Sequence, residues 1–233
     1  SNLNTAEEYF YRGRENSNKG FIIEAIADYT QAIQLNPNFA EAYIGRAICK
    51  GELNDHNGAI ADNTQAIKLN PNHLQMVFYN RGISKNYLKD YYGAISDFTK
   101  AIEIDPNYAI AYNHRGAIKA KLKDYNGAIS DYTKAIELNP NYEYPYTNRA
   151  YAKDKLEDYY GAISDHTKTI ELNPNNAEAY YNRGKSKDAL KDHNGAIADF
   201  TQAIKLNPNH LFAYTNRGIS KNYLKDYYGA ISD

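Results

Sequence analysis

The sequence predicts an all-α fold in which antiparallel helix hairpins stack into a solenoid. Two observations predict it: a proline preceded by Asn or Asp returns at a nearly constant interval, and apolar residues at helical spacing fill the intervals. The steps are 34, 35, 34, 34 and 34 residues between Pro37, Pro71, Pro106, Pro140, Pro174 and Pro208. Since self-similarity at such a period is typical of repeat architectures, each interval is expected to be one structural unit.

Each unit is predicted to contain two helices, as residues 109–142 illustrate. Apolar and small side chains follow at spacings of three and four in both halves, without the alternation of a strand. Asp124 is a suitable N-cap for the second helix. Asn139-Pro140 should end that helix, because the residue before proline is displaced from the α region. Asn141 is then expected to cap the first helix of the next unit.

The expected organisation is six full units and a truncated seventh, whose second helix would continue beyond Asp233 in a longer array. Residues 1–5 are interpreted as a leader or tag remnant, so that the native N-terminus would be missing. The 35-residue step falls within residues 74–78, where a local irregularity is expected. The unit boundaries are 6–39, 40–73, 74–108, 109–142, 143–176, 177–210 and 211–233.

A longer repeat lies on top of the short one. Residues His56–Leu74 match His193–Leu211 with a single change, Asn63 against Phe200. Units two and three are therefore near-copies of units six and seven. This indicates that the array grew by duplication of a block of four units.

Composition excludes several classes of function. The formal net charge of −1 gives no electrostatic case for binding nucleic acid or an anionic membrane. No run of about 18 apolar residues occurs, so no membrane insertion is expected. The single cysteine, Cys49, excludes an internal disulfide and is expected to be a small core residue. Nothing fixes the compartment, and a cytoplasmic location is favoured.

The recurring positions resemble those of the tetratricopeptide repeat (TPR) family, in a variant that carries Asn-Arg-Gly in several units. The resemblance covers residues 6–233, with alanine at the twentieth position of every unit. The fourth position is aromatic in Tyr9, Tyr43, Phe78, Tyr112, Tyr146, Tyr180 and Tyr214. The eighth is small in Gly13, Ala47, Gly82, Gly116, Ala150, Gly184 and Gly218. The resemblance implies a right-handed superhelix that binds proteins in a concave groove.

Two positions depart from the family pattern. The seventh, usually leucine, is arginine in every unit, and the twenty-third is aspartate in every unit. An arginine that faces into a hairpin is costly unless a carboxylate pairs with it, so these rows are expected to form structural ion pairs, within or between repeats. They include Arg115, Asp131, Arg149, Asp165, Arg183 and Asp199. A lysine row at the eleventh position is read as paired or solvated, with a phosphate-binding stripe as the alternative.

No constellation of residues points to catalysis. The six histidines form no His-x-x-x-His motif, and their duplicates lie four units apart, so no metal site is predicted. The glycines recur with the period of the array and are not followed by a phosphate-binding motif. The sequence therefore predicts neither an enzyme nor a bound cofactor.

The family resemblance implies that first-helix residues line the groove. The sixth position bears asparagine repeatedly, and an amide both donates and accepts, so a ladder of amides can hold the backbone of an extended peptide, similar to the ladder of O-GlcNAc transferase. Tyrosines beside it would add apolar contact area. The candidate groove residues are Tyr79, Asn80, Tyr87, Asn113, His114, Tyr144, Asn148, Tyr151, Tyr181, Asn182, Lys185, Phe212, Asn216 and Tyr223.

Other functions stay open beside a scaffold that binds an unknown protein or peptide. The carboxylate clamp of some TPR proteins is not reproduced, since the fifth position has no lysine. An architectural solenoid could associate head to tail through its last, incomplete unit. The array could also be the targeting arm of a larger enzyme.

Overall fold

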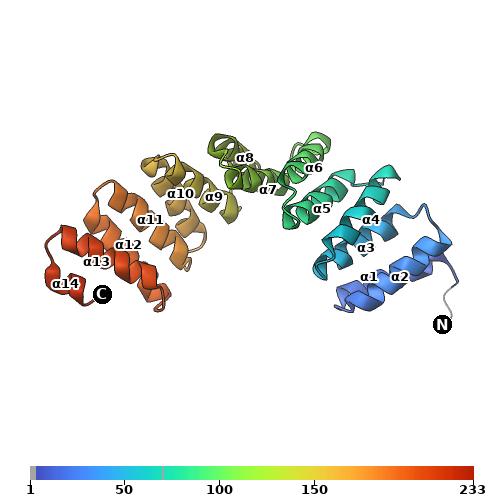
Figure 1. Ribbon diagram of the computed structural model, residues 1–233, viewed down its shortest axis with the longest axis horizontal. Helices are drawn as coiled ribbons and strands as arrows, with labels where there is room; N and C mark the ends of the chain where they lie inside the picture. Colours follow the sequence, from blue (N-terminus) through green and yellow to red (C-terminus); the bar gives the residue numbers. More distant parts are fainter. Residues whose placement is uncertain (1–3, 70) are drawn as a thin grey trace. The chain divides into compact units, whose positions relative to one another are not determined.

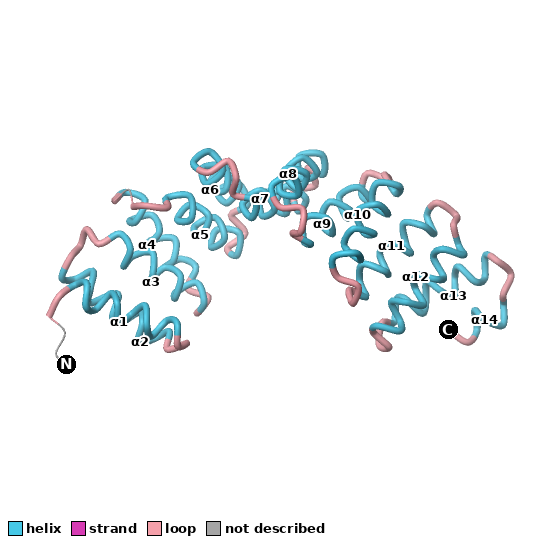
Figure 2. The backbone as a smooth tube through the Cα atoms, turned by 180° about the vertical axis from the view of Figure 1, so that it is seen from behind, coloured by secondary structure: helices cyan, strands magenta, loops and turns pink. Residues whose placement is uncertain are grey.

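The computed structural model describes residues 4–69 and 71–233, and these form fourteen helices joined by short loops (Figures 1 and 2). The helices are α1 (Ala6–Asn18), α2 (Ile22–Leu35), α3 (Ala40–Glu52), α4 (His56–Lys68), α5 (Leu74–Tyr87), α6 (Tyr91–Ile104), α7 (Ala109–Lys121), α8 (Tyr125–Leu138), α9 (Glu143–Lys155), α10 (Tyr159–Leu172), α11 (Ala177–Ala189), α12 (His193–Leu206), α13 (Leu211–Tyr223) and α14 (Tyr227–Ile231). They pair into seven hairpins, which confirms the all-α repeat fold.

The chain divides into two compact units, Ser1–Ile118 and Lys119–Asp233. In the first unit, each helix from α2 to α6 packs on the helix before it. In the second, the same holds from α9 to α14. Each unit is thus a stack in which a helix contacts mainly its neighbours along the chain, as expected for a solenoid. The handedness of the whole array stays a prediction.

The turn inside the second to seventh hairpins follows one pattern, seen between α9 and α10. Glu157 adopts a left-handed conformation (φ 61°), and the Asp158 N–H donates to the Lys153 carbonyl at 2.9 Å, which closes the end of α9. The Asp158 carboxylate then caps α10 by accepting from Gly161 N–H at 3.0 Å. A Cβ on Gly161 would clash with that carboxylate, which explains the glycine. The first hairpin differs, with Gly20 in the left-handed conformation (φ 80°) and no side-chain cap bond from Phe21.

The predicted caps have mixed outcomes. Asp124 caps α8 by accepting from Gly127 N–H at 2.9 Å, as predicted. The prediction for Asn141 is wrong, because Tyr142 is the N-cap residue of α9 and makes no side-chain cap bond. The Asn141 N–H instead donates to Asn139 Oδ1 at 3.2 Å, so a turn across the proline occupies this stretch.

The junction before the third repeat is irregular, but at His73, just before the predicted residues 74–78, which belong to the regular helix α5. Helix α4 ends at Lys68 and α5 begins at Leu74, after His73 in a left-handed conformation (φ 61°) without a side-chain cap bond. Its duplicate His210 has φ −79° and accepts from Ala213 N–H through Nδ1 at 3.3 Å. The extra residue therefore alters both the backbone and the cap.

The start of the chain differs from a simple leader. Residues 1–3 of the expected leader lie outside the described residues. Thr5 caps α1: its Oγ1 accepts from Glu8 N–H at 3.1 Å, and the Glu8 carboxylate accepts from the Thr5 N–H at 3.0 Å. This reciprocal capping box makes Thr5 part of the first hairpin.

Small apolar residues form the core between helices. The alanines of the twentieth position are at most 1% exposed from Ala25 to Ala196. Cys49 is fully buried beside Tyr29 and Ala42, as predicted for a core residue. Small side chains therefore let the helices pack closely, and polar contacts help to fix how the helices of a hairpin cross.

An arginine in the first helix of each hairpin organises those polar contacts. Arg149 donates from Nε and Nη2 to the two carboxylate oxygens of Asp165, at 2.9 and 2.6 Å. Its Nη1 donates to Thr133 Oγ1 of the preceding hairpin at 2.9 Å, and its guanidinium lies 5.8 Å from the centre of the Tyr146 ring. Lys153 Nζ lies 2.8 Å from Asp165 Oδ2. The carboxylate thus joins two cations, and the arginine joins two hairpins.

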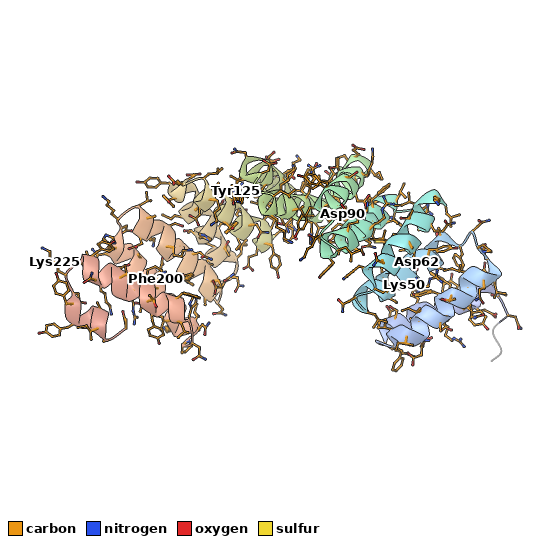
Figure 3. All side chains as sticks on the ribbon, in the orientation of Figure 1. Lys50, Asp62, Asp90, Tyr125, Phe200 and Lys225 are labelled. Atoms are coloured by element: carbon orange, nitrogen blue, oxygen red, sulfur yellow. The ribbon has the colours of Figure 1, made fainter. Side chains whose placement is uncertain are left out.

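The same paired arginine recurs sixteen residues before its aspartate in other repeats: Arg12–Asp28, Arg46–Asp62, Arg81–Asp97, Arg183–Asp199 and Arg217–Asp233. Each of these pairs lies within one repeat. The lysines of the eleventh position reach the same carboxylates, and Figure 3 labels one such pair, Lys50 and Asp62, at 2.7 Å. Arg115 and Asp131 belong to different compact units, so their pairing stays a prediction.

Asp165→Asn is expected to lower the free energy of unfolding by about 3 kcal/mol, because it leaves two partly buried cations without their counter-charge. Asp165 itself is 3% exposed. Urea unfolding measures the change. The control is Glu171→Gln, which breaks the exposed pair with Lys168 and should cost far less. Equal losses in the two variants would contradict a stabilising role for the buried pair.

Tyr29 gives a prediction for alkaline pH. Burial raises the pKa of its phenol from about 10 to about 12. The stability that this group contributes is therefore complete below pH 10 and is lost as the pH rises through 12, because the unfolded chain ionises first. Between these pH values the free energy of unfolding should fall by about 1.4 kcal/mol per pH unit more in the wild type than in Tyr29→Phe. Urea unfolding at several pH values measures this difference. An equal fall in the free energy of unfolding with pH in the two proteins would refute the prediction.

Candidate binding site

A cavity of about 490 Å³ lies in the second compact unit, between the first helices of two successive repeats. Helices α9 and α11 form its sides, and α10 contributes Tyr159 and His166. Four of the predicted groove residues line it: Asn148, Tyr151, Asn182 and Lys185. The structure therefore brings together candidates from the sixth and ninth positions of both repeats.

Two cations border this cavity. Lys155 Nζ lies 5.2 Å from the centre of the Tyr151 ring, and Lys185 Nζ lies 5.5 Å from that of Tyr181. Both lysine residues are exposed. The faces of the aromatic rings attract the ammonium groups and hold them beside the cavity.

With Ser186, His166 is one of the two most deeply buried residues that line the cavity. It is 1% exposed, and within the described chain neither of its ring nitrogens has a hydrogen-bond partner. Nε2 lies 3.6 Å from Asp154 Oδ2, beyond hydrogen-bond distance, while Asp154 Oδ1 accepts from Ser186 Oγ at 2.7 Å. Buried polar atoms are rarely left unpaired, because their desolvation is then uncompensated. The imidazole can therefore bond to a polar group that enters the cavity.

A second cavity, of about 310 Å³, occupies the corresponding place in the first compact unit, between α3, α4 and α5. It is lined by the predicted residues Asn80 and Tyr87, and Tyr87 stacks on His56 with ring centres 4.4 Å apart. Asn63 is 1% exposed there, and its Oδ1 has no partner in the described chain. The two cavities thus share both their location and a buried, unpaired polar side chain.

The location of both cavities follows from the twenty-fourth position of the repeat. This position carries Tyr29, Asn63, Phe98, Tyr132, His166 and Phe200 in order. Where a full ring is present, the eighth position is glycine, and a Cβ on Gly184 would lie only 2.7 Å from Phe200. Where Asn63 or His166 replaces the ring, the eighth position is Ala47 or Ala150. These two cavities therefore lie where a six-membered ring is absent.

Sequence reasoning missed His166, Asp154, Tyr159 and Ser186 as lining residues. In the sequence, His166 is one of six histidines that form no metal-binding motif. Comparing the twenty-fourth position across the repeats would have singled it out, together with the matching change from glycine to alanine.

Several predicted groove residues are packed instead of lining a cavity. Tyr79 and Tyr181 each join a core cluster between successive repeats. Asn113 is buried, and the His114 ring contacts Tyr79 at 5.4 Å. Rings of the fifth position cover the neighbouring hairpin, which is why they do not face the cavities.

The remaining predicted residues lie near the surface. Tyr144 and Phe212 are exposed. Tyr223 stacks on His193 with ring centres 4.8 Å apart. Asn216 Nδ2 donates to the Tyr181 hydroxyl at 3.1 Å. Burial raises the pKa of the Tyr181 phenol, although this hydrogen bond opposes the shift. Asn216 thus uses one amide N–H within its own chain, and its amide also carries a second N–H and an acceptor oxygen.

Metal binding and membrane insertion find no structural basis in the part of the chain that the structure describes. It contains no group of three or more His, Cys, Asp or Glu side chains that could hold a metal ion. Within the same residues, no helix has both the length and the apolar character needed to cross a membrane.

Family models of the tetratricopeptide repeat match residues 40–73, 76–108, 109–142 and 177–210. The matches span more than half of the chain, which therefore belongs to the tetratricopeptide repeat family. Both models describe the repeat, and neither is an enzyme family. No curated protein sequence matches the chain.

Solved structures show the same fold. YrrB, described as a TPR protein with an unusual peptide-binding site, has a TM-score of 0.69 at 24% identity, covering 79% of this chain and 95% of YrrB. PilF of Pseudomonas aeruginosa has a TM-score of 0.74 at 18% identity, covering 88% and 93%. The Cut9–Hcn1 hetero-tetramer of APC/C has a TM-score of 0.70 at 20% identity, covering 93% of this chain and 42% of that one.

We explain the cavity beside His166 by the missing six-membered ring at the twenty-fourth position. This explanation predicts the effect of restoring the ring and so closing the cavity. Ala150→Gly with His166→Phe copies the Gly184 and Phe200 arrangement of the next repeat. It should raise the free energy of unfolding by about 1 kcal/mol, because an apolar ring replaces an unpaired buried imidazole.

The reverse variant, Gly184→Ala with Phe200→His, is the matched control for closing the cavity. It should lower the free energy of unfolding by about 3 kcal/mol, since it removes a buried ring. Urea unfolding compares both variants with the wild type. A loss of stability in the closing variant would contradict this explanation of the cavity.

Proposed function

We propose that this TPR array is a protein-interaction scaffold that binds an extended segment of a partner along the first helices of its repeats. The observation that carries the proposal is the cavity between α9 and α11, where Asn148, Asn182, Tyr151 and Lys185 converge. The repeat pattern of the sequence and the geometry of the cavity both point to these four residues.

The chemistry of the cavity suits a peptide backbone. An asparagine amide can accept from a peptide N–H and donate to a peptide carbonyl, so it binds the main chain whatever the sequence. Asn148 and Asn182 occupy the sixth position of successive repeats, and Asn216 continues the series on α13. Tyr151 adds an exposed ring that can cover apolar side chains. Peptide binding by YrrB supports the proposal by structural analogy.

One alternative is an architectural role, in which the solenoid stacks on a second copy of itself. Another is a role as the targeting arm of a larger enzyme. Exposed Leu211 and Phe212 on α13 favour self-association. Mass measured over a range of concentrations distinguishes the two functions. A scaffold that binds peptides keeps a constant mass, whereas a stacking solenoid grows heavier with concentration.

The combined variant Asn148→Ala, Asn182→Ala and Asn216→Ala tests the ladder. A random peptide library is first selected against the wild-type chain, and the best peptide becomes the probe in a fluorescence titration. The variant lacks three amides that are proposed to contact the backbone of the peptide. Its affinity for the peptide should therefore fall at least about tenfold, while its free energy of unfolding changes little.

The control variant carries Asn126→Ala, Asn194→Ala and Asn209→Ala, three exposed residues outside the first helices. It should bind the selected peptide like the wild type. Unchanged binding in the ladder variant would refute the role of the asparagines, and a selection that yields no peptide would refute the scaffold.

A further inference from the structure

The cavity between α9, α10 and α11 has an excess of positive charge. In the part of the chain that the structure describes, neither Lys155 nor Lys185 forms an ion pair, and each ammonium group contacts an aromatic ring instead. The one carboxylate that lines the cavity, Asp154, already accepts a hydrogen bond from Ser186. Two cations therefore border the cavity with their charge available to a ligand.

The buried end of the same cavity offers a hydrogen bond. A neutral imidazole carries one N–H donor, and the nitrogens of His166 have no partner among the described residues. A carboxylate bonded both to a buried donor and to two ammonium groups forms charge-assisted hydrogen bonds, which are stronger than neutral ones. An aspartate or glutamate side chain is small enough to enter a space of about 490 Å³.

We propose that this cavity is a side-chain pocket for an acidic residue, aspartate or glutamate, of the bound segment. Lys155 and Lys185 attract the carboxylate at the mouth, and His166 donates to it at the buried end. The pocket rests on the proposed scaffold function, and it adds a sequence preference to a ladder that binds any backbone.

The corresponding cavity of the first unit shows that the charge is particular to this pocket. Glu52 stands there at the position of Lys155, and Ile83 stands at the position of Lys185. The fold therefore builds this kind of cavity without cations, and the lysines are not required to form it. The same comparison supplies substitutions that the repeat is known to accommodate.

The experiment uses two small probes that differ only in charge: N-acetyl-glutamate α-methylamide, with one carboxylate, and its isostere N-acetyl-glutamine α-methylamide. Each is titrated into the whole chain while NMR follows the imidazole signals of His166, which His166→Phe identifies by their loss. The carboxylate probe should shift these signals and bind at least about tenfold more tightly than the amide, since only its charge-assisted bonds differ.

Two variants make the result specific. Lys155→Glu with Lys185→Ile, copied from the other cavity, should abolish the difference between the probes. Lys134→Gln with Lys205→Gln removes two positive charges from second helices and should leave the difference intact. Equal affinity of the two probes for the wild type, or a difference that survives in the first variant, would overturn the pocket.

The outcome is separable from that of the scaffold proposal. If the peptide selection fails while the carboxylate probe still shifts His166, the scaffold is refuted, and the cavity binds a carboxylate that does not belong to a bound segment. If peptides are selected but show no enrichment of acidic residues, and the probes bind equally, only the pocket is refuted.

Discussion

The contact between an arginine of the first helix and an aspartate of the second is the interaction on which each hairpin depends. Small residues such as Ala25 and Ala128 at the twentieth position allow the helices to approach closely but specify little about register. The Arg149 guanidinium has oxygen partners at Nε, Nη1 and Nη2, and Asp165 accepts from two cations. Because every member is paired, the network tolerates burial and fixes how the helices cross.

Because these ion pairs stabilise the hairpins, positions of the first helix outside the network, such as the ninth, can vary. Stability is carried by the seventh, eleventh and twenty-third positions, which hardly change along the chain. The ninth position, in contrast, is Ile48, Ile83, Tyr151 or Lys185 in different repeats. A surface whose residues are not needed for folding can acquire binding specificity at little cost in stability.

The sequence was sufficient for the fold, because burial in a repeat array is local and the period exposes it directly. It also identified the cap at Asp124 and the buried Cys49, which depend on neighbours within one hairpin. It failed at Asn141, where a side-chain turn across Pro140 competes with capping. At Tyr79 and Tyr181 the family pattern pointed to the groove, but contacts with the next hairpin turn those rings into the core. The cavity around His166 was missed because it depends on the absence of a six-membered ring at the twenty-fourth position. Only a comparison of this position between repeats reveals that absence.

The bond from each arginine to the threonine of the preceding hairpin gives the array a polarity. Thr133 satisfies its own hydroxyl hydrogen by donating to the Ile129 carbonyl at 2.7 Å, so it loses little if the following hairpin detaches. Arg149, by contrast, loses an acceptor if the hairpin before it opens. The bond therefore always runs in one direction along the chain, from the first helix of a hairpin to the second helix of the hairpin before it.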